Sequence, residues 1–163
     1  MKGVFLSIGS NKGDRLLNIN TAIQLINRKV GKVVICSPIY ENPPLGFEAE
    51  LNFYNVCLEV ETDSSPFELL KKTQDIEVEV GRTSKSKFGN YSSRIIDIDI
   101  VLYNDYQILS ELLTIPHLLF RERRFVLQPL CDLAPNFIDP ITKKAIFDIL
   151  EVCKDGSVLK IVM

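Results

Sequence analysis

The segment RIIDIDIVLY, residues 94–103, alternates between apolar and acidic side chains. Isoleucine recurs at every second position, and Asp97 and Asp99 occupy the positions between. Side chains two residues apart on a strand point to the same face, so the segment predicts a strand with an apolar face and an acidic face. Two neighbouring carboxylates repel each other unless a positive charge lies between them. Oxygen ligands favour Mg²⁺ or Mn²⁺ over zinc, and we therefore expect a divalent cation here.

A solvated strand face would also accommodate two aspartates, but the flanking segments favour a site. Four basic residues and no acidic residue lie between positions 82 and 94: Arg82, Lys85, Lys87 and Arg94. A second basic cluster follows in FRERRF, residues 120–125. Carboxylates that bind magnesium and guanidinium groups that bind phosphate oxygens are the combination that phosphoryl transfer requires.

Hydrophobic periodicity places the other elements around this strand. We expect strands at 4–8, 31–41, 53–62, 95–103 and 106–111, and helices at 16–30 and 64–82. Pro38 should interrupt the second strand, while Pro66 and Gly81 suit the start and the end of the second helix. A short helix before Pro135, and a helix and a last strand within 145–163, complete the chain.

The order β-α-β-β-α-β predicts an α+β, ferredoxin-like fold. We expect an antiparallel sheet with helices on one face, plus an extra strand and C-terminal elements. A chain of 163 residues is long enough for one domain with its own core, so residues 1–163 should form a single domain.

The composition is that of a soluble globular protein, with 46% hydrophobic residues, 25% charged residues and a net charge of −2. We therefore expect no nucleic acid and no membrane as partner. Neither a signal-peptide core nor an apolar run near the roughly 20 residues of a membrane span occurs, which predicts a cytoplasmic protein. Four separated cysteines and one histidine do not suit a zinc site.

Two further features each leave two interpretations open. Phe53 and Asn55 share a strand face, and an aromatic ring beside an amide can bind a flat heterocycle; the alternative is a core aromatic next to a polar loop residue. His117, the only histidine, is either a structural hydrogen-bonding group or a phosphate contact. The glycines of GSNKGD, residues 9–14, are too closely spaced for a P-loop and predict a strand-to-helix turn.

Several motifs together match one known family in order and spacing over nearly the whole chain. They are SIGSNKGDR at 7–15, NPPLG at 42–46, FYN at 53–55, GR at 81–82, RIIDIDIVLY at 94–103, TIPH at 114–117 and ERRFVLQPLCDLAP at 122–135. On these motifs the chain resembles the 6-hydroxymethyl-7,8-dihydropterin pyrophosphokinases of folate biosynthesis. The resemblance implies that ATP donates a pyrophosphoryl group to the hydroxymethyl oxygen of the pterin and that AMP is released. We expect the enzyme to act as a monomer.

The resemblance also implies the residues of the site. Catalytic roles fall to Arg82, Arg94, Asp97 and Asp99, with the two aspartates holding two Mg²⁺ ions. ATP would contact Gln74, Glu77, Lys85, Ile100, Leu113, Thr114, His117 and Arg123. The pterin would lie between Phe53 and Phe125, with its edge bound by Asn55 and by the backbone of Pro44, Leu45 and Gly46.

The chain departs from the family pattern in and near the loop before Arg94. Ser84 stands where a second arginine is common, Leu118 stands where a tyrosine is common, and the loop itself is longer. Either Phe88 or Tyr91 would be the aromatic residue that covers the site when residues 83–93 close over it and exclude water.

Two rival functions remain at this point. A nucleotidyltransferase with a two-metal site would need a third carboxylate on a neighbouring strand, for which Glu59 and Glu61 are candidates. A non-catalytic binding module of the same fold would tolerate the substitution Asp97→Asn.

Overall fold

The computed structural model describes residues 1–82 and 93–162 and contains one main sheet and one small sheet. The strands are β1 (Val4–Ser10), β2 (Lys32–Cys36), β3 (Tyr40–Asn42), β4 (Phe53–Glu61), β5 (Asp97–Tyr103), β6 (Ile108–Leu109), β7 (Thr114–Ile115) and β8 (Lys160–Ile161). The helices are α1 (Arg15–Lys29), α2 (Pro66–Val80), α3 (Arg124–Leu133) and α4 (Ile146–Glu151), with a 3₁₀ turn at Phe120–Glu122.

The main sheet has six strands in the order β5-β1-β4-β3-β8, and β2 also pairs with β4. β1 is antiparallel to both β4 and β5, and places Gly9 between Asn55 and Asp97. β2 and β3 pair with successive parts of β4, on either side of the interruption at Pro38. The predicted antiparallel, ferredoxin-like α+β fold and the break at Pro38 are confirmed.

Local signals explain where the two long helices begin and end. Asp14 caps α1 by accepting a hydrogen bond from the Leu17 backbone N–H at 3.0 Å. Ser65 and Glu68 form a reciprocal capping box at the start of α2, which ends at Gly81 with φ +129°. The predicted start at Pro66 and end at Gly81 are therefore confirmed.

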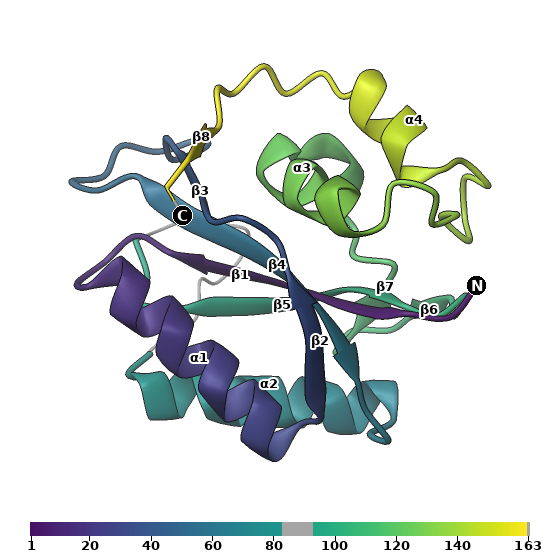
Figure 1. Ribbon diagram of the computed structural model, residues 1–163, viewed down its shortest axis with the longest axis horizontal. Helices are drawn as coiled ribbons and strands as arrows, with labels where there is room; N and C mark the ends of the chain where they lie inside the picture. Colours follow the sequence, from purple (N-terminus) through teal and green to yellow (C-terminus); the bar gives the residue numbers. More distant parts are fainter. Residues whose placement is uncertain (83–92, 163) are drawn as a thin grey trace.

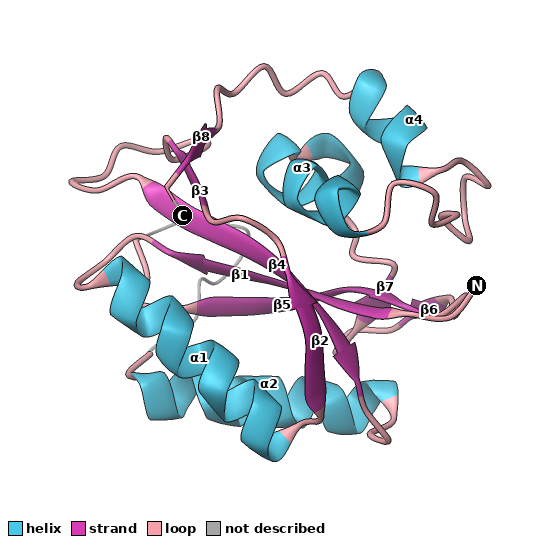
Figure 2. Cartoon of the chain, in the orientation of Figure 1, coloured by secondary structure: helices cyan, strands magenta, loops and turns pink. Residues whose placement is uncertain are grey.

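The sheet separates two hydrophobic cores, because alternate residues of its strands point to opposite faces. α1 and α2 cover one face, and α3 and α4 lie over the other (Figures 1 and 2). Ile8 and Ile98 belong to the first core, while Phe5, Cys57 and Val101 belong to the second. The prediction of helices on one face holds for α1 and α2 only, since the C-terminal helices form a third layer.

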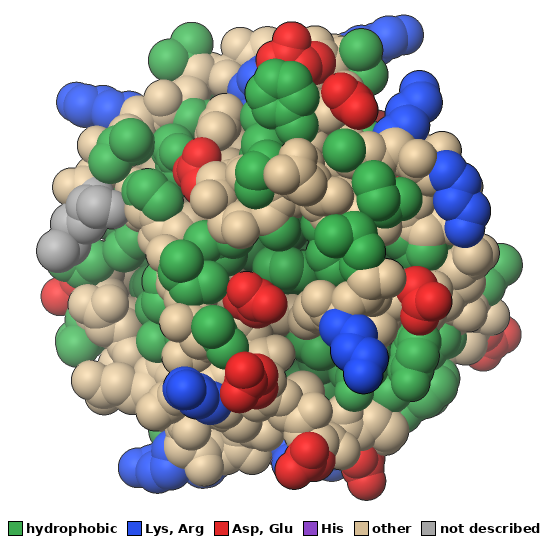
Figure 3. Space-filling model, turned by 45° about the vertical axis from the view of Figure 1, so that its right-hand side comes forward, with side chains coloured by type: hydrophobic (Ala, Val, Ile, Leu, Met, Phe, Trp, Pro, Cys, Tyr) green, Lys and Arg blue, Asp and Glu red, His purple; other side chains and the backbone are tan. Residues whose placement is uncertain are grey.

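The surface is mixed in character. On the face drawn in Figure 3, acidic and basic side chains are interspersed among apolar ones. Among the described residues, no helix has both the length and the apolar character needed to span a bilayer. In the small sheet, β6 lies within the predicted strand at 106–111, whereas β7 was not predicted. The two strands are antiparallel, and Ile108 pairs with Ile115.

Candidate active site

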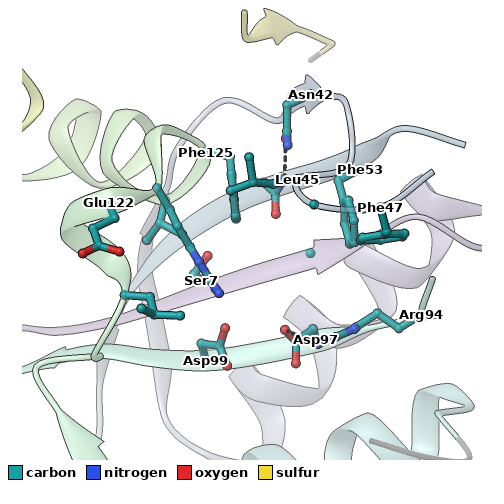
Figure 4. A pocket seen from close by; sticks show the side chains of 16 residues that line it. Ser7, Asn42, Leu45, Phe47, Phe53, Arg94, Asp97, Asp99, Glu122 and Phe125 are labelled. Atoms are coloured by element: carbon teal, nitrogen blue, oxygen red, sulfur yellow. Dashed lines mark hydrogen bonds and ion pairs between the residues drawn. The ribbon is translucent and has the colours of Figure 1, made fainter. Parts of the chain in front are cut away.

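A pocket of about 330 Å³ lies on the sheet face that α3 and α4 leave partly uncovered. Its floor is the polar part of three adjacent strands, with Ser7 and Gly9 on β1, Asn55 on β4, and Asp97 and Asp99 on β5. Its walls are the segment between β3 and β4 and the start of α3 (Figure 4). The remaining lining residues are Asn42, Leu45, Gly46, Phe47, Phe53, Arg94, Leu119, Glu122, Arg123, Phe125 and Val126.

Asp97 is held by two guanidinium groups. Arg82 Nη1 lies 2.7 Å from Asp97 Oδ1, and Arg94 Nη1 lies 3.0 Å from Oδ2. Burial opposes ionisation of Asp97, but the positive charges of Arg94 and Arg82 outweigh it and hold the pKa of this carboxyl below its ordinary value. Asp97 is therefore a carboxylate at neutral pH.

Arg82 and Glu77 form a buried support behind Asp97. The side chain of Arg82 is 6% exposed, and its Nη1 also donates to Glu77 Oε2 at 2.9 Å. The same oxygen accepts the Ile98 backbone N–H at 2.9 Å, which joins α2 to the strand between the two aspartates. Arg82 and Glu77 thus fix the position of β5.

The backbone of Arg94 is fixed by Asn11, which follows β1. Asn11 Oδ1 accepts the Arg94 N–H at 2.8 Å, and the Asn11 N–H donates to the Arg94 carbonyl at 3.1 Å. This reciprocal pair sets the point from which the Arg94 side chain reaches Asp97. The motif SIGSNKGDR pointed to this segment, but no local pattern predicted its partner.

Asp99 faces the pocket in a different electrostatic setting. Burial and the negative charges of Asp97 and Glu77 raise the pKa of Asp99 to about 8, against the attraction of Arg123 and Arg94. Carboxyl oxygens crowded by negative neighbours form a site that a divalent cation stabilises. The arrangement therefore fits the predicted magnesium site in the chemistry of its donors.

The described residues contain no cluster of three or more His, Cys, Asp or Glu side chains that could hold a metal by themselves. Mg²⁺ is commonly bound by one or two carboxylates with substrate phosphates and water completing its shell. Asp97 and Asp99 are thus suited to a metal that arrives with a phosphate ligand.

His117 lies beside Asp99, with Nε2 3.8 Å from Asp99 Oδ2. Its Nδ1 accepts the Leu119 backbone N–H at 3.1 Å, which places the ring proton on Nε2. Burial and the neighbouring charge of Arg123 lower the pKa of His117 to about 4, so the imidazole is neutral at pH 7 and directs an N–H toward the acidic pair.

The other half of the pocket is an aromatic and amide slot. Phe53 on β4 and Phe125 on α3 lie on different sides of it (Figure 4). Asn55 Nδ2 donates to Asn42 Oδ1 at 2.5 Å, which orients the Asn55 amide. Phe47 packs edge-on against Phe53, with ring centroids 6.1 Å apart. A flat ring with polar edges fits this combination of groups.

Gly9 makes room for that amide. A Cβ atom at this position would lie 2.7 Å from Asn55 Oδ1, so any side chain here would force the amide to move. The sequence FLSIGS alternates, so the reasoning applied to Asp97 and Asp99 could have placed Ser7 and Gly9 on the same face. Asn42 gave no such signal, because its role depends on the pairing of β3 with β4.

The structure brings some of the predicted residues into one pocket and leaves others beside it. Those that line it are Leu45, Gly46, Phe53, Asn55, Arg94, Asp97, Asp99, Arg123 and Phe125. Those that lie outside its lining are Pro44, Gln74, Glu77, Arg82, Ile100, Leu113, Thr114 and His117. The predictions for Lys85, Ser84, Phe88 and Tyr91 fall outside the described residues.

Comparison with known proteins decides the family. The model of the 7,8-dihydro-6-hydroxymethylpterin-pyrophosphokinase (HPPK) family matches residues 5–135. The chain belongs to this family. It is 41% identical to the 2-amino-4-hydroxy-6-hydroxymethyldihydropteridine pyrophosphokinase of Porphyromonas gingivalis over 133 residues, which cover 81% of this chain and 90% of that protein. The pyrophosphokinase of Aquifex aeolicus is also 41% identical, over 88% of each chain.

Some similar proteins are much longer. The folic acid synthesis protein fol1 of Schizosaccharomyces pombe is 41% identical over 92% of this chain, which spans only 20% of that protein. The solved HPPK-DHPS structure from Plasmodium falciparum shares the fold, with a TM-score of 0.73 and 19% identity over 93% of this chain and 43% of that chain. A second HPPK-DHPS crystal structure, in complex with substrates, gives a TM-score of 0.74 at 16% identity.

The alternative function of a nucleotidyltransferase needs a third carboxylate near Asp97 and Asp99, and the register of the sheet does not place one of its candidates, Glu59 or Glu61, there. The β4 residues across β1 from Asp97 and Asp99 are Asn55 and Cys57. Glu59 pairs with Phe5, further along the sheet, and both Glu59 and Glu61 line a different cavity.

Proposed function

We propose that this chain transfers the pyrophosphoryl group of ATP to the hydroxymethyl oxygen of 6-hydroxymethyl-7,8-dihydropterin in folate biosynthesis, with AMP as the second product. The observation that carries the proposal is that an acidic pair, Asp97 and Asp99, and an aromatic–amide slot, Phe53 and Asn55, line the same pocket. A metal-bound phosphate donor and a flat heterocyclic acceptor can therefore meet within it.

Asp97 and Asp99 would hold two Mg²⁺ ions together with the phosphates of ATP. When bound, the ions neutralise phosphate charge and align the donor for in-line attack. Arg82 would keep Asp97 in place, since its Nη1 lies 2.7 Å from Asp97 Oδ1 and is itself held by Glu77 Oε2 at 2.9 Å. Arg94 and Arg123 reach the pocket and would contact phosphate oxygens. The neutral imidazole of His117 would donate its Nε2–H to the same phosphate oxygens.

The nucleoside of ATP would lie beyond the pocket, along the outer edge of β5. β5 is the edge strand of the main sheet, and α2 and β7 flank it. The predicted nucleotide contacts come from these elements: Gln74 and Glu77 from α2, Ile100 from β5, Thr114 from β7, and Leu113 just before it.

The pterin would enter the slot between Phe53 and Phe125, with its edge toward Asn55 and the backbone from Pro44 to Gly46. The hydroxymethyl oxygen then attacks the β-phosphorus and loses its proton. The bond from the β-phosphorus to the oxygen bridging the α- and β-phosphates breaks, and that oxygen leaves with AMP. Exclusion of water matters in this step, because water would compete as acceptor.

We propose that a monomer is the active form, because a single chain supplies both the acidic pair and the aromatic–amide slot. ATP as donor and four cysteines that are free thiols suit the reducing cytoplasm.

The test is a product assay with Mg-ATP, with and without 6-hydroxymethyl-7,8-dihydropterin. We expect AMP to form only when the pterin is present, in equal amount to the pterin diphosphate. Release of pyrophosphate in place of AMP would support a nucleotidyltransferase instead. Absence of pterin-dependent AMP would refute the proposal.

A further inference from the structure

The segment 43–52 carries one wall of the pocket, and its two ends are set by neighbouring residues of β3 and β4. Asn42, the last residue of β3, pairs with Phe53, the first residue of β4, and both line the pocket. Leu45, Gly46 and Phe47 reach the pocket from the segment between them. Whatever fixes the separation of these two strand ends therefore fixes the aromatic and amide slot.

Arg15, the first residue of α1, contacts the last residue of this segment and the strands on either side of it, from the opposite face of the sheet. Its Nη1 lies 3.2 Å from Glu41 Oε2 and 2.9 Å from the Asn52 carbonyl oxygen. Its Cζ lies 3.8 Å above the centre of the Tyr54 ring, and its Nη2 donates to the Tyr54 hydroxyl at 3.3 Å. One guanidinium group thus joins β3, the end of the segment 43–52 and β4.

Arg15 is held on a capped helix and is mostly buried. Asp14 caps the helix that carries it, and the Arg15 side chain is only 18% exposed. Glu41 and Tyr54 are paired residues of β3 and β4, immediately before Asn42 and after Phe53. Their contacts with Arg15 are therefore transmitted along the backbone to the residues whose side chains line the pocket.

We propose that Arg15 is a positioning residue of the acceptor subsite, which keeps the ends of the segment 43–52 in the geometry that binds the heterocycle. Arg15 does not line the pocket and acts through Asn42 and Phe53. It has no comparable contacts with Asp97 or Asp99 among the described residues, so its effect should fall on the acceptor and not on ATP. This inference rests on the proposed function, because it takes the pterin as the ligand of the slot.

The size of the effect follows from a population argument. The affinity for a ligand falls by the fraction of molecules in which the binding geometry is present. Loss of hydrogen bonds from a charged group is large enough to reduce that fraction to about a tenth, which would raise the pterin KM about tenfold. The ATP KM should change less than about twofold, because the described residues proposed to contact ATP lie on α2 and in the ranges 94–100 and 113–123, away from Glu41, Asn52 and Tyr54.

The experiment compares Arg15→Ala, Arg15→Lys and Glu41→Gln with the unaltered chain. Lysine keeps the charge but cannot stack on Tyr54 and bind two oxygens at once, so we expect Arg15→Lys to lie between the unaltered chain and Arg15→Ala. Arg28→Ala is the matched control on the same helix, since the Arg28 side chain is 69% exposed and 3.9 Å from Glu79. Each variant is measured for pterin KM, ATP KM, kcat and melting temperature.

A pterin KM that rises in Arg15→Ala while the ATP KM stays constant would support the proposal. An unchanged pterin KM, or an equal rise in both KM values, would overturn it. If Arg15→Ala does not fold, Glu41→Gln decides: a pterin-specific rise supports the proposal and no rise overturns it. If the unaltered chain forms no pterin-dependent AMP, the proposed function itself is refuted. If the unaltered chain turns over normally and Arg15→Ala has the same pterin KM, only the inference about Arg15 is refuted.

Discussion

Removal of Arg82 should destabilise the protein strongly, because it would leave two acidic groups close together under the pocket. Arg82 Nη1 contacts Glu77 Oε2 at 2.9 Å and Asp97 Oδ1 at 2.7 Å, and the Glu77 side chain is 2% exposed. Breaking a buried ion pair from one side costs about 3–5 kcal/mol, since the remaining charge stays buried without compensation. For a chain of this size the melting temperature of Arg82→Ala should fall by roughly 6–20 °C.

The double variant Arg82→Met, Glu77→Leu separates this cause from a general packing defect. It removes the buried acid together with its partner, so it should be more stable than Arg82→Ala although it carries more changes. Urea denaturation at pH 7 measures both free energies of unfolding. A loss below about 1 kcal/mol in Arg82→Ala, or a double variant less stable than the single one, would show that Arg82 does not stabilise the fold by compensating the charge of Glu77.

Two further predictions concern other parts of the structure. Gly9→Ala places a methyl group 2.7 Å from Asn55 Oδ1, so the amide must move; we expect a pterin KM raised at least about fivefold and stability reduced by about 1–3 kcal/mol, measured by kinetics and thermal melting. Asp139, fully buried, accepts hydrogen bonds from Arg121 at 2.6 and 2.9 Å, and although burial opposes its ionisation, these bonds hold its pKa below the ordinary value. The ionised Asp139 side chain therefore stabilises the fold above its ordinary pKa near 4, and this stabilisation disappears as the pH falls through the folded-state pKa. Asp139→Asn should lower the free energy of unfolding by about 1–3 kcal/mol at pH 7 and by progressively less in acid. A difference in unfolding free energy that is constant with pH would contradict this prediction.

The main elements were predictable because their signals are local. The alternation around Asp97 and Asp99 defines both faces of β5 within a few residues. Ser65, Pro66 and Gly81 mark the two ends of α2 by capping chemistry alone.

The support of the site was not predictable in the same way. The contact of Arg82 with Glu77 depends on how α2 packs against β5, and no short pattern encodes that packing. Asn42 and Asn55 meet through the register of two strands separated by the segment 43–52. The third layer formed by α3 and α4 likewise arises from tertiary packing against Phe5, Cys57 and Val101.

We propose that Asp97 and Asp99 hold the magnesium of the donor in the pocket that also receives the pterin. The most direct measurement is magnesium- and pterin-dependent AMP release by Asp97→Asn and Asp99→Asn, with the exposed Asp105→Asn as matched control. We predict that both site variants fold and lose about 100-fold or more in kcat, while Asp105→Asn keeps full activity. Folded Asp97→Asn and Asp99→Asn proteins that both retain the kcat of the unaltered chain would contradict the account.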